Sequence, residues 1–165
     1  MSIKQLIFVL SLFQSFNLNA KTVEASMDDL WSGLSHAANE AANIAVLDDV
    51  FHSTATIYGV RYQQQAANLR VLTRDEFLSS LAKVRDTGFY ECEIARKIIQ
   101  YDRFATVYSV VESRTDKAQT HPDFTGVNSV QLYKDDDRWR IVSLYYQVEH
   151  PSIPIESTLP KRDCK

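Results

Sequence analysis

The side chains best suited to chemistry in this sequence are carboxylates and imidazoles, which can move a proton, and tyrosine hydroxyls, which can donate a hydrogen bond. The candidate bases are His36, His52, Glu91, Glu93 and Glu112, and the candidate donors are Tyr58, Tyr90, Tyr108 and Tyr145. Glu112 stands out because alternation along a strand places it on one face with Tyr108 and Thr106. Arg114 continues that face, so an ion pair at the rim of a sheet explains the same set equally well.

The other candidate bases have simpler structural explanations. His52 ends a predicted short helix, where a positive charge stabilises the helix dipole, and His36 falls near the edge of an apolar helical stripe. Glu91 and Glu93 share one face of a strand, which predicts a solvated outer face more readily than an acid–base pair. If the protein is an enzyme, we therefore predict Glu112 and His52 as its catalytic side chains.

The sequence carries no other catalytic or metal-binding pattern. The four histidines, at positions 36, 52, 121 and 150, have no HxH or HxxxH spacing, so we predict no metal site. There is no GxSxG turn for a nucleophilic serine, and four glycines in the whole chain are too few for a glycine-rich phosphate loop. We expect no cofactor.

Residues 1–20 have the pattern of a secretory signal peptide. Lys4 supplies a positive charge, an apolar stretch follows over Leu6–Phe16, and the segment ends at Ala20. The apolar stretch is shorter than the roughly 20 residues that span a membrane. We therefore expect a secreted or periplasmic protein with no membrane attachment after cleavage, a domain over residues 21–150 and an irregular, proline-rich tail over residues 151–165.

The mature chain is mildly acidic and contains two cysteines. Removing residues 1–20 takes away one lysine and no acid, which changes the formal net charge from −3 to −4. Because no basic stripe is present, we expect neither nucleic acid nor an anionic membrane as a partner. Cys92 and Cys164 could form a disulfide in an oxidising compartment; the alternative is a buried free thiol at Cys92 and a loose one in the tail.

Helices come first in the mature chain and strands follow. A long helix is predicted from Ser26, with an apolar stripe that reaches Ala45, and a shorter helix follows over residues 46–52. A β-branched strand over residues 54–60 comes next, and Thr73 caps a third helix. The rest of the domain divides into four long strands, over residues 89–99, 104–114, 125–134 and 138–149. This order predicts an α+β fold.

Three stretches, in this order, resemble the nuclear-transport-factor-2-like (NTF2-like) superfamily. NIAVLDDVFHSTATIYGV, at residues 43–60, is similar to that family's second helix and first strand, which ends near a glycine, here Gly59. LTRDEFLSSL, at residues 72–81, is similar to its third helix, and DDDRWRIVSLYYQVE, at residues 135–149, to its last strand. The resemblance covers about residues 26–149, and small secreted bacterial SnoaL-like proteins are the most similar members.

The resemblance implies a cystatin-like cone, in which a curved antiparallel sheet wraps around three helices and leaves a cavity. Alternation then gives the last strand two faces, and we predict that its mixed face lines the cavity: Trp139, Ile141, Ser143, Tyr145 and Gln147. The opposite face would pack against a second subunit, because such proteins commonly dimerise through the sheet: Val142, Leu144, Tyr146 and Val148. The alternative assignment places Val142 and Leu144 beneath the helices.

The resemblance leaves three functions open, because the superfamily contains enzymes, ligand-binding domains and structural domains. The leading hypothesis is a cavity that binds a small, partly apolar molecule, with no established catalysis. The residues predicted to contact it are Trp31, Tyr58, Tyr108, Trp139, Ser143, Tyr145 and Gln147. The alternatives are a cofactor-independent cyclase, isomerase or dehydratase using general acid–base chemistry, and a structural or interaction module with a filled cavity.

Overall fold

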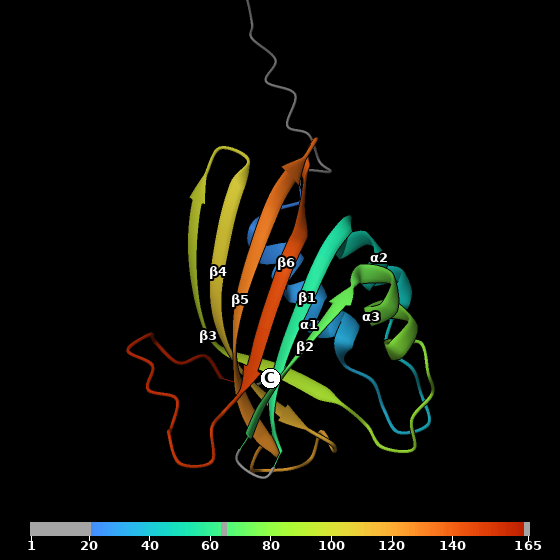
Figure 1. Cartoon of the computed structure of the whole chain (residues 1–165), viewed down its shortest axis with the longest axis vertical. Helices are drawn as coiled ribbons and strands as arrows, with labels where there is room; N and C mark the ends of the chain where they lie inside the picture. The colour runs from blue at the N-terminus through green and yellow to red at the C-terminus, as the bar shows by residue number, and fades with distance from the viewer. Residues whose placement is uncertain (1–20, 64–65, 164–165) are drawn as a thin grey trace, which may run out of the picture.

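The computed structural model describes residues 21–63 and 66–163, and it has three helices packed on one side of a six-stranded sheet (Figure 1). The helices are α1 (Val23–Leu34), α2 (Ile44–Val50) and α3 (Arg74–Leu81). The strands are β1 (Phe51–Gln63), β2 (Ala66–Thr73), β3 (Tyr90–Tyr101), β4 (Phe104–Arg114), β5 (Phe124–Asp135) and β6 (Arg138–Val148). The predicted signal peptide, residues 1–20, lies outside the described residues.

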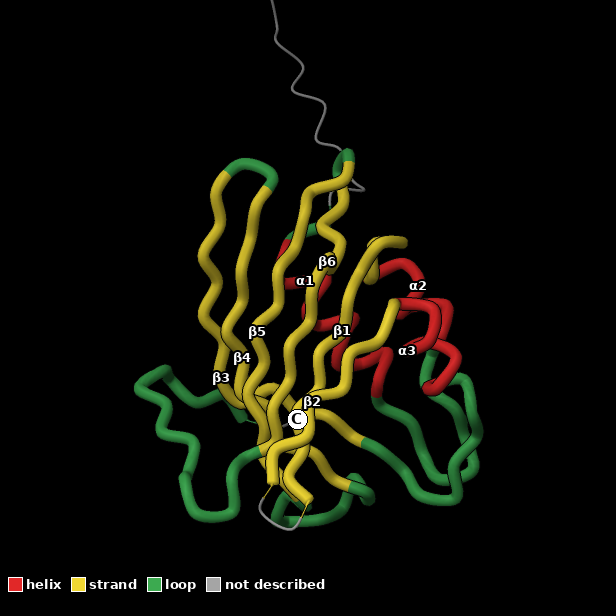
Figure 2. Tube along the Cα trace, viewed as in Figure 1, coloured by secondary structure: helices red, strands yellow, loops and turns green. Residues whose placement is uncertain are grey.

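The sheet has the strand order β2-β1-β6-β5-β4-β3. Hairpins join β1 to β2, β3 to β4 and β5 to β6, whereas β1 lies parallel to β6 (Figure 2). The predicted α+β class is confirmed, but the sheet is mixed rather than wholly antiparallel. The parallel pair follows from the chain path, because β2, α3 and three strands separate β1 from β6 in sequence.

The predicted third helix is confirmed, and aspartates form the turns between the long strands. Asp102 and Asp136 adopt left-handed backbone conformations, with φ of 48° and 51°, in the turns before β4 and β6. Aspartate tolerates that conformation better than most residues. Thr73 begins α3 with a reciprocal cap, in which its hydroxyl accepts from the Glu76 backbone N–H and the Glu76 carboxylate accepts from the Thr73 backbone N–H.

The first helix differs from its prediction at both ends. Thr22, not Ser26, is the N-cap, and the Ser26 hydroxyl instead donates to the backbone oxygen of Trp139 at 2.7 Å. The helix stops at Leu34 because the backbone of Ser35 turns to an extended conformation. The Ser35 hydroxyl donates to the Trp31 backbone oxygen at 2.8 Å, which satisfies part of the helix end. The apolar spacing that continues to Ala45 belongs to the connection and to α2.

A β-bulge in β6 overturns the prediction of two continuous faces. Gln131 of β5 pairs with Ser143 and the next residue, Leu132, pairs with Ile141, so Val142 is the extra residue on β6. Trp139 and Ile141 therefore point towards the helices before the bulge, and Leu144 and Tyr146 do so after it. Because one inserted residue reverses the alternation, neither predicted face is uniform.

A buried guanidinium, that of Arg96, joins the edge strand β3 to an exposed carboxylate of α1. The side chain of Arg96 is 3% exposed and that of Glu93 is 5% exposed, with 2.5 Å between their charged atoms. Arg96 also contacts the Asp28 carboxylate of α1 at 2.6 Å, and the Ser109 hydroxyl donates to Glu93 at 2.6 Å. The prediction that Glu91 and Glu93 lie on a solvated outer face is wrong, because serines of β4 and Arg96 pair with them on the inner side.

The C-terminal tail lies against the outer face of the sheet. Ile155 and Leu159 pack on a small apolar cluster that includes Ile94 and Val110. The Arg162 backbone N–H donates to the Ile94 backbone oxygen at 2.7 Å. The described part of the tail contains no helix or long strand. No helix within the described ranges is long and apolar enough to cross a membrane.

The second cysteine, Cys164, lies outside the described residues. Cys92 does not carry a free thiol in the structure. The predicted disulfide between the two therefore stays a prediction.

Gly59 makes room for the ring of Tyr146, which yields a stability prediction. A Cβ atom on Gly59 would overlap the Tyr146 ring, so we expect Gly59→Ala to lower the free energy of unfolding by about 1–3 kcal/mol. The cost should fall by at least half when Tyr146 is first replaced by leucine, as a urea-unfolding double-mutant cycle will measure. Equal costs in both backgrounds would contradict this packing.

Candidate functional site

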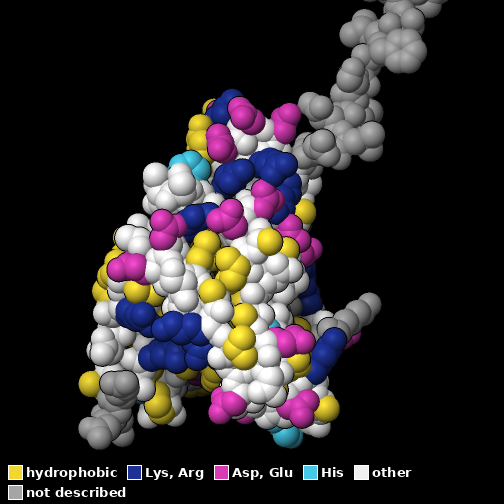
Figure 3. Space-filling view, turned by 90° about the vertical axis from the view of Figure 1, so that its right-hand side faces the viewer, with side chains coloured by type: hydrophobic (Ala, Val, Ile, Leu, Met, Phe, Trp, Pro, Cys, Tyr) yellow, Lys and Arg dark blue, Asp and Glu magenta, His cyan; other side chains and the backbone are white. Residues whose placement is uncertain are grey.

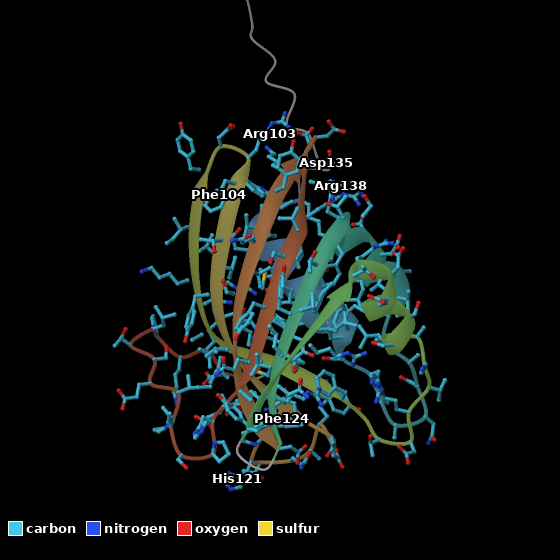
Figure 4. All side chains as sticks on the ribbon, viewed as in Figure 1. Arg103, Phe104, His121, Phe124, Asp135 and Arg138 are labelled. Atoms are coloured by element: carbon cyan, nitrogen blue, oxygen red, sulfur yellow. The ribbon has the colours of Figure 1, made fainter. Side chains whose placement is uncertain are left out.

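A cavity of about 120 Å³ lies between the helices and the inner face of the sheet. Its apolar wall includes Leu34 of α1, Phe77 and Leu81 of α3, and Val111 and Phe124 of the sheet. Phe124 lies at the opposite end of the sheet from Arg103, Asp135 and Arg138 (Figure 4). The cavity is therefore at the end of the molecule away from the tips of the β3–β4 and β5–β6 hairpins. Its polar lining residues are Trp31, Arg61, Glu91, Asn128, Tyr146 and Gln147.

Glu91 brings a carboxyl group into this apolar environment. It stands near the start of β3, where its backbone N–H donates to the Ser35 hydroxyl at 3.0 Å. The Ser113 hydroxyl of β4 donates to the Glu91 carboxylate at 2.5 Å. Burial raises the pKa of the Glu91 carboxyl from 4.5 to about 7, while the Ser113 hydrogen bond and the charge of Arg61 oppose that rise. Near neutral pH, Glu91 can thus either accept or donate a proton.

Glu91 also lines a more polar groove outside the cavity. The groove is bounded by Ser35, His36 and Glu40 on one side and by Arg114 and three residues of the following loop on the other. His36 is buried, and its Nδ1 lies 3.0 Å from the backbone oxygen of Ala37. Because Glu91 lines both spaces, its carboxyl group stands between the apolar cavity and a polar, open surface.

Two hydrogen-bond donors in the cavity wall have no partner among the described residues. They are the indole nitrogen Nε1 of Trp31 and the amide nitrogen Nδ2 of Asn128. Trp31 is 6% exposed and Asn128 is 4% exposed. A buried donor left unpaired costs about 1–3 kcal/mol, so each of these atoms favours a ligand that supplies an acceptor.

Two of the seven predicted ligand-contact residues line the cavity, Trp31 and Gln147. The side-chain amide of Gln147 donates to the Tyr62 hydroxyl and accepts from the Tyr145 hydroxyl, each at 3.1 Å. Trp139 is in the core, beneath α1, and does not reach the cavity. The other four do not line it either: Tyr58, Tyr108, Ser143 and Tyr145.

The two predicted catalytic residues, Glu112 and His52, do not line the cavity. Glu112 is on the outer face of β4, where it pairs with Arg114 at 2.7 Å and borders the space beneath the tail. The His52 ring is at the start of β1, 2.8 Å from the Thr54 hydroxyl. The rim ion pair that explained Glu112 from the sequence is the contact that the structure contains. The structure does not bring these two residues together.

Sequence reasoning did not single out Asn128 and gave Glu91 a surface role. A signal for both was available in β4 and β5. Ser109 and Ser113 alternate with Val107 and Val111, so small hydroxyl residues occur on an otherwise apolar face and mark the places where an acid on β3 is paired. Asn128 likewise stands in a strand whose neighbours on the same face, Gly126 and Val130, are buried.

The described part of the chain holds no group of three His, Cys, Asp or Glu side chains that could bind a metal ion. The cavity is suited to a small organic molecule that carries a hydrogen-bond acceptor, because its wall is largely apolar with a few polar groups.

Comparison with known proteins separates fold from function. No protein-family model matches the sequence, and no curated protein is significantly similar to it. Solved structures do match. An NTF2-like protein from Cytophaga hutchinsonii superposes with a TM-score of 0.58 at 11% identity, covering 77% of this chain and 95% of that one. An NTF2-like protein of unknown function from Silicibacter pomeroyi gives 0.54 at 18% identity, with 76% and 92% covered.

The chain has the NTF2-like fold. A provisionally named dehydratase of the NTF2-like family from Streptomyces avermitilis also matches, with a TM-score of 0.57 at 11% identity over 79% of this chain and 95% of that one. The predicted resemblance is thereby confirmed for the fold. At these identities the NTF2-like fold alone is shared, so the chemistry of this cavity has to be argued from its own residues.

The raised pKa of Glu91 makes stability depend on pH. The folded protein binds this proton more tightly than the unfolded chain, so Glu91 destabilises the fold increasingly as pH rises from about 4.5 to about 7, and fully above that. We expect Glu91→Gln to raise the free energy of unfolding by up to about 3 kcal/mol at about pH 8 and by little at about pH 4.5, measured by urea unfolding.

The matched control for this prediction is Glu93→Gln, two residues along the same strand. Glu93 is paired with Arg96, so removing its charge leaves a buried guanidinium without that partner and should destabilise the protein at about pH 8. A Glu91→Gln effect that did not change with pH would contradict the assignment of a raised pKa to Glu91.

Proposed function

We propose that this NTF2-like domain binds a small, largely apolar molecule in its cavity, through an acceptor atom that pairs with Trp31 and Asn128. The observation that carries the proposal is the pair of unpartnered donors in an apolar wall. The size of the cavity limits the ligand. An engineered protein cavity of about 150 Å³ binds benzene, so a cavity of about 120 Å³ suits a single ring or a compact aliphatic group.

Filling the cavity should abolish binding. Val111 is buried and lines the cavity, so Val111→Phe should weaken the binding of toluene, a single-ring probe, at least about tenfold, as measured by NMR titration of backbone amides. Val142→Phe is the matched control, because Val142 is the half-buried bulge residue of β6 and does not line the cavity. Absence of toluene binding to the wild-type chain would reject the cavity as a ligand site and favour a structural module.

Proton transfer is the second candidate function, and Glu91 is the observation that favours it. A carboxylate with a pKa of about 7 can take a proton from the carbon next to a carbonyl group, breaking the C–H bond and forming an O–H bond on Glu91. The electron pair then passes to the carbonyl oxygen, towards which Trp31 and Asn128 could donate. If the substrate carries a C=C bond between its β- and γ-carbons, return of the proton to the γ-carbon moves that double bond next to the carbonyl group and completes an isomerisation without a cofactor.

Hydrogen exchange tests this chemistry directly. Cyclopentanone in D₂O should exchange its α-protons faster with the wild-type protein than without it, and Glu91→Gln should remove that acceleration, by about 100-fold or more. Glu112→Gln and His52→Gln test the assignment made from the sequence. If exchange is lost in either of those variants but kept in Glu91→Gln, the base is Glu112 or His52 and not Glu91. If the wild-type protein does not accelerate exchange at all, the proton-transfer function is rejected and ligand binding is the remaining proposal.

We also propose that the protein is exported, cut after Ala20 and dimeric through the outer face of the sheet. The signal-peptide pattern of residues 1–20 is the reason for proposing export and cleavage. Large apolar side chains that are exposed on the outer face of β4 and β5 support the dimer: Phe104, Tyr108 and Tyr133. Native mass spectrometry of the protein from its own compartment gives both the processed mass and the number of subunits.

A further inference from the structure

We infer that the ligand of this cavity is a small organic anion, whose carboxylate is bound by Arg61 at the cavity mouth. This inference rests on the proposed function and adds the chemical class of the ligand. Nothing in the fold itself requires a charged residue at this position, so the argument depends on the surroundings of Arg61.

Arg61 is the one arginine among the described residues that lines the cavity. It does so from the end of β1, and its residue surface is exposed. No ion pair holds Arg61 within the part of the chain that the structure describes; Arg70 and Arg85 share that property but do not line the cavity. The charge of Arg61 also acts on Glu91. A guanidinium without an ion-pair partner beside a cavity is available to bind an anion.

The remaining polar atoms of the cavity favour the same ligand. Trp31 and Asn128 contribute N–H groups without partners, so the polar groups open to a ligand are donors. A carboxylate only accepts hydrogen bonds and has two oxygens, which match the paired N–H groups of a guanidinium. An apolar ring in the cavity with its carboxylate at the mouth would satisfy both the wall and the donors.

Glu91, the acidic residue in the cavity wall, does not prevent an anionic ligand from binding. Glu91 is protonated about half the time near neutral pH, and its carboxyl group is already bonded to the Ser113 hydroxyl. The other charged or titratable groups around it lie in the groove, namely His36, Glu40, Arg114 and Lys117. Two of them are cations, Lys117 and Arg114, and Arg114 is paired with Glu112. A nearby positive charge lowers the cost of bringing a second carboxylate close to Glu91.

The side of the molecule that carries α2 and α3 has basic side chains at its surface. Figure 3 views this side and shows one group of Lys and Arg side chains on its lower half and another on its upper half, with Asp and Glu side chains among them. Basic side chains at a surface raise the local concentration of anions.

Two probes of the same shape test the inference. Benzoate and nitrobenzene are planar rings with two terminal oxygens, and only benzoate is charged. At about pH 6 and constant ionic strength, we expect the wild-type protein to bind benzoate at least about tenfold more tightly than nitrobenzene, by NMR titration. Arg61→Met should weaken benzoate binding by about 10- to 100-fold and change nitrobenzene binding by less than about twofold.

Arg70→Met is the matched control. Arg70 is an exposed arginine of β2, paired with Gly59 in the sheet, and it does not line the cavity. We expect this variant to bind both probes as the wild-type protein does. Because Arg61 and Arg70 are both exposed on neighbouring strands, neither change should unfold the domain.

The possible outcomes separate this inference from the function on which it rests. If nitrobenzene binds as tightly as benzoate, the inference that the ligand is an anion is wrong, and the cavity is still a binding site. Equal losses of benzoate affinity in Arg61→Met and Arg70→Met would also overturn it, because the general field of the surface would then be responsible. If the wild-type protein binds neither probe, both the inference and the proposed function fail.

Discussion

The structure depends on one buried guanidinium, that of Arg96. A charge removed from water must be paired, and Arg96 meets this requirement with Glu93 on its own strand and Asp28 on α1. These contacts fix the distance between the first helix and the edge of the sheet. They also hold β3 in place beside β4, where Ser109 donates to Glu93. The sheet therefore packs against α1 in a defined position. The cavity lies at the end of the molecule away from the β3–β4 and β5–β6 hairpin tips.

The position of that space decides which polar groups share it. Trp31 lies on α1 three residues beyond Asp28, so the helix that Arg96 contacts also carries the indole to the cavity wall. Glu91 lies two residues before Glu93 on the same inner face of β3. The two acids have different partners. Glu93 is ion-paired with Arg96, whereas Glu91 accepts from the Ser113 hydroxyl and has only a more distant arginine nearby. Burial raises the pKa of the Glu91 carboxyl, and these two partners oppose that rise.

The sequence was sufficient for the order of the elements and insufficient for the side of the sheet that each residue occupies. The Thr73 cap and the β-branched, alternating runs of the strands are local signals, and each predicted its element. The face of a strand depends on register, which bulges change. Val142 in β6 reverses the alternation, so Ser143 and Tyr145 point away from the cavity, while Leu144 and Tyr146 point towards the helices. Glu91 was misassigned because its serine partner is 22 residues away in the chain.

The tail has a consequence for how copies of this protein behave at high concentration. A sheet has two edge strands, here β2 and β3. The unpaired backbone N–H and C=O groups of an edge strand can form hydrogen bonds with a strand of another chain. The Arg162 backbone N–H donates to the Ile94 backbone oxygen of β3, at the bulge in that strand. The apolar residues of the tail cover the surface beside it. The other edge strand, β2, is the shortest strand of the sheet and carries Arg70. Both edge strands are therefore poor templates for the addition of further strands. We expect the protein to resist fibre formation at high concentration.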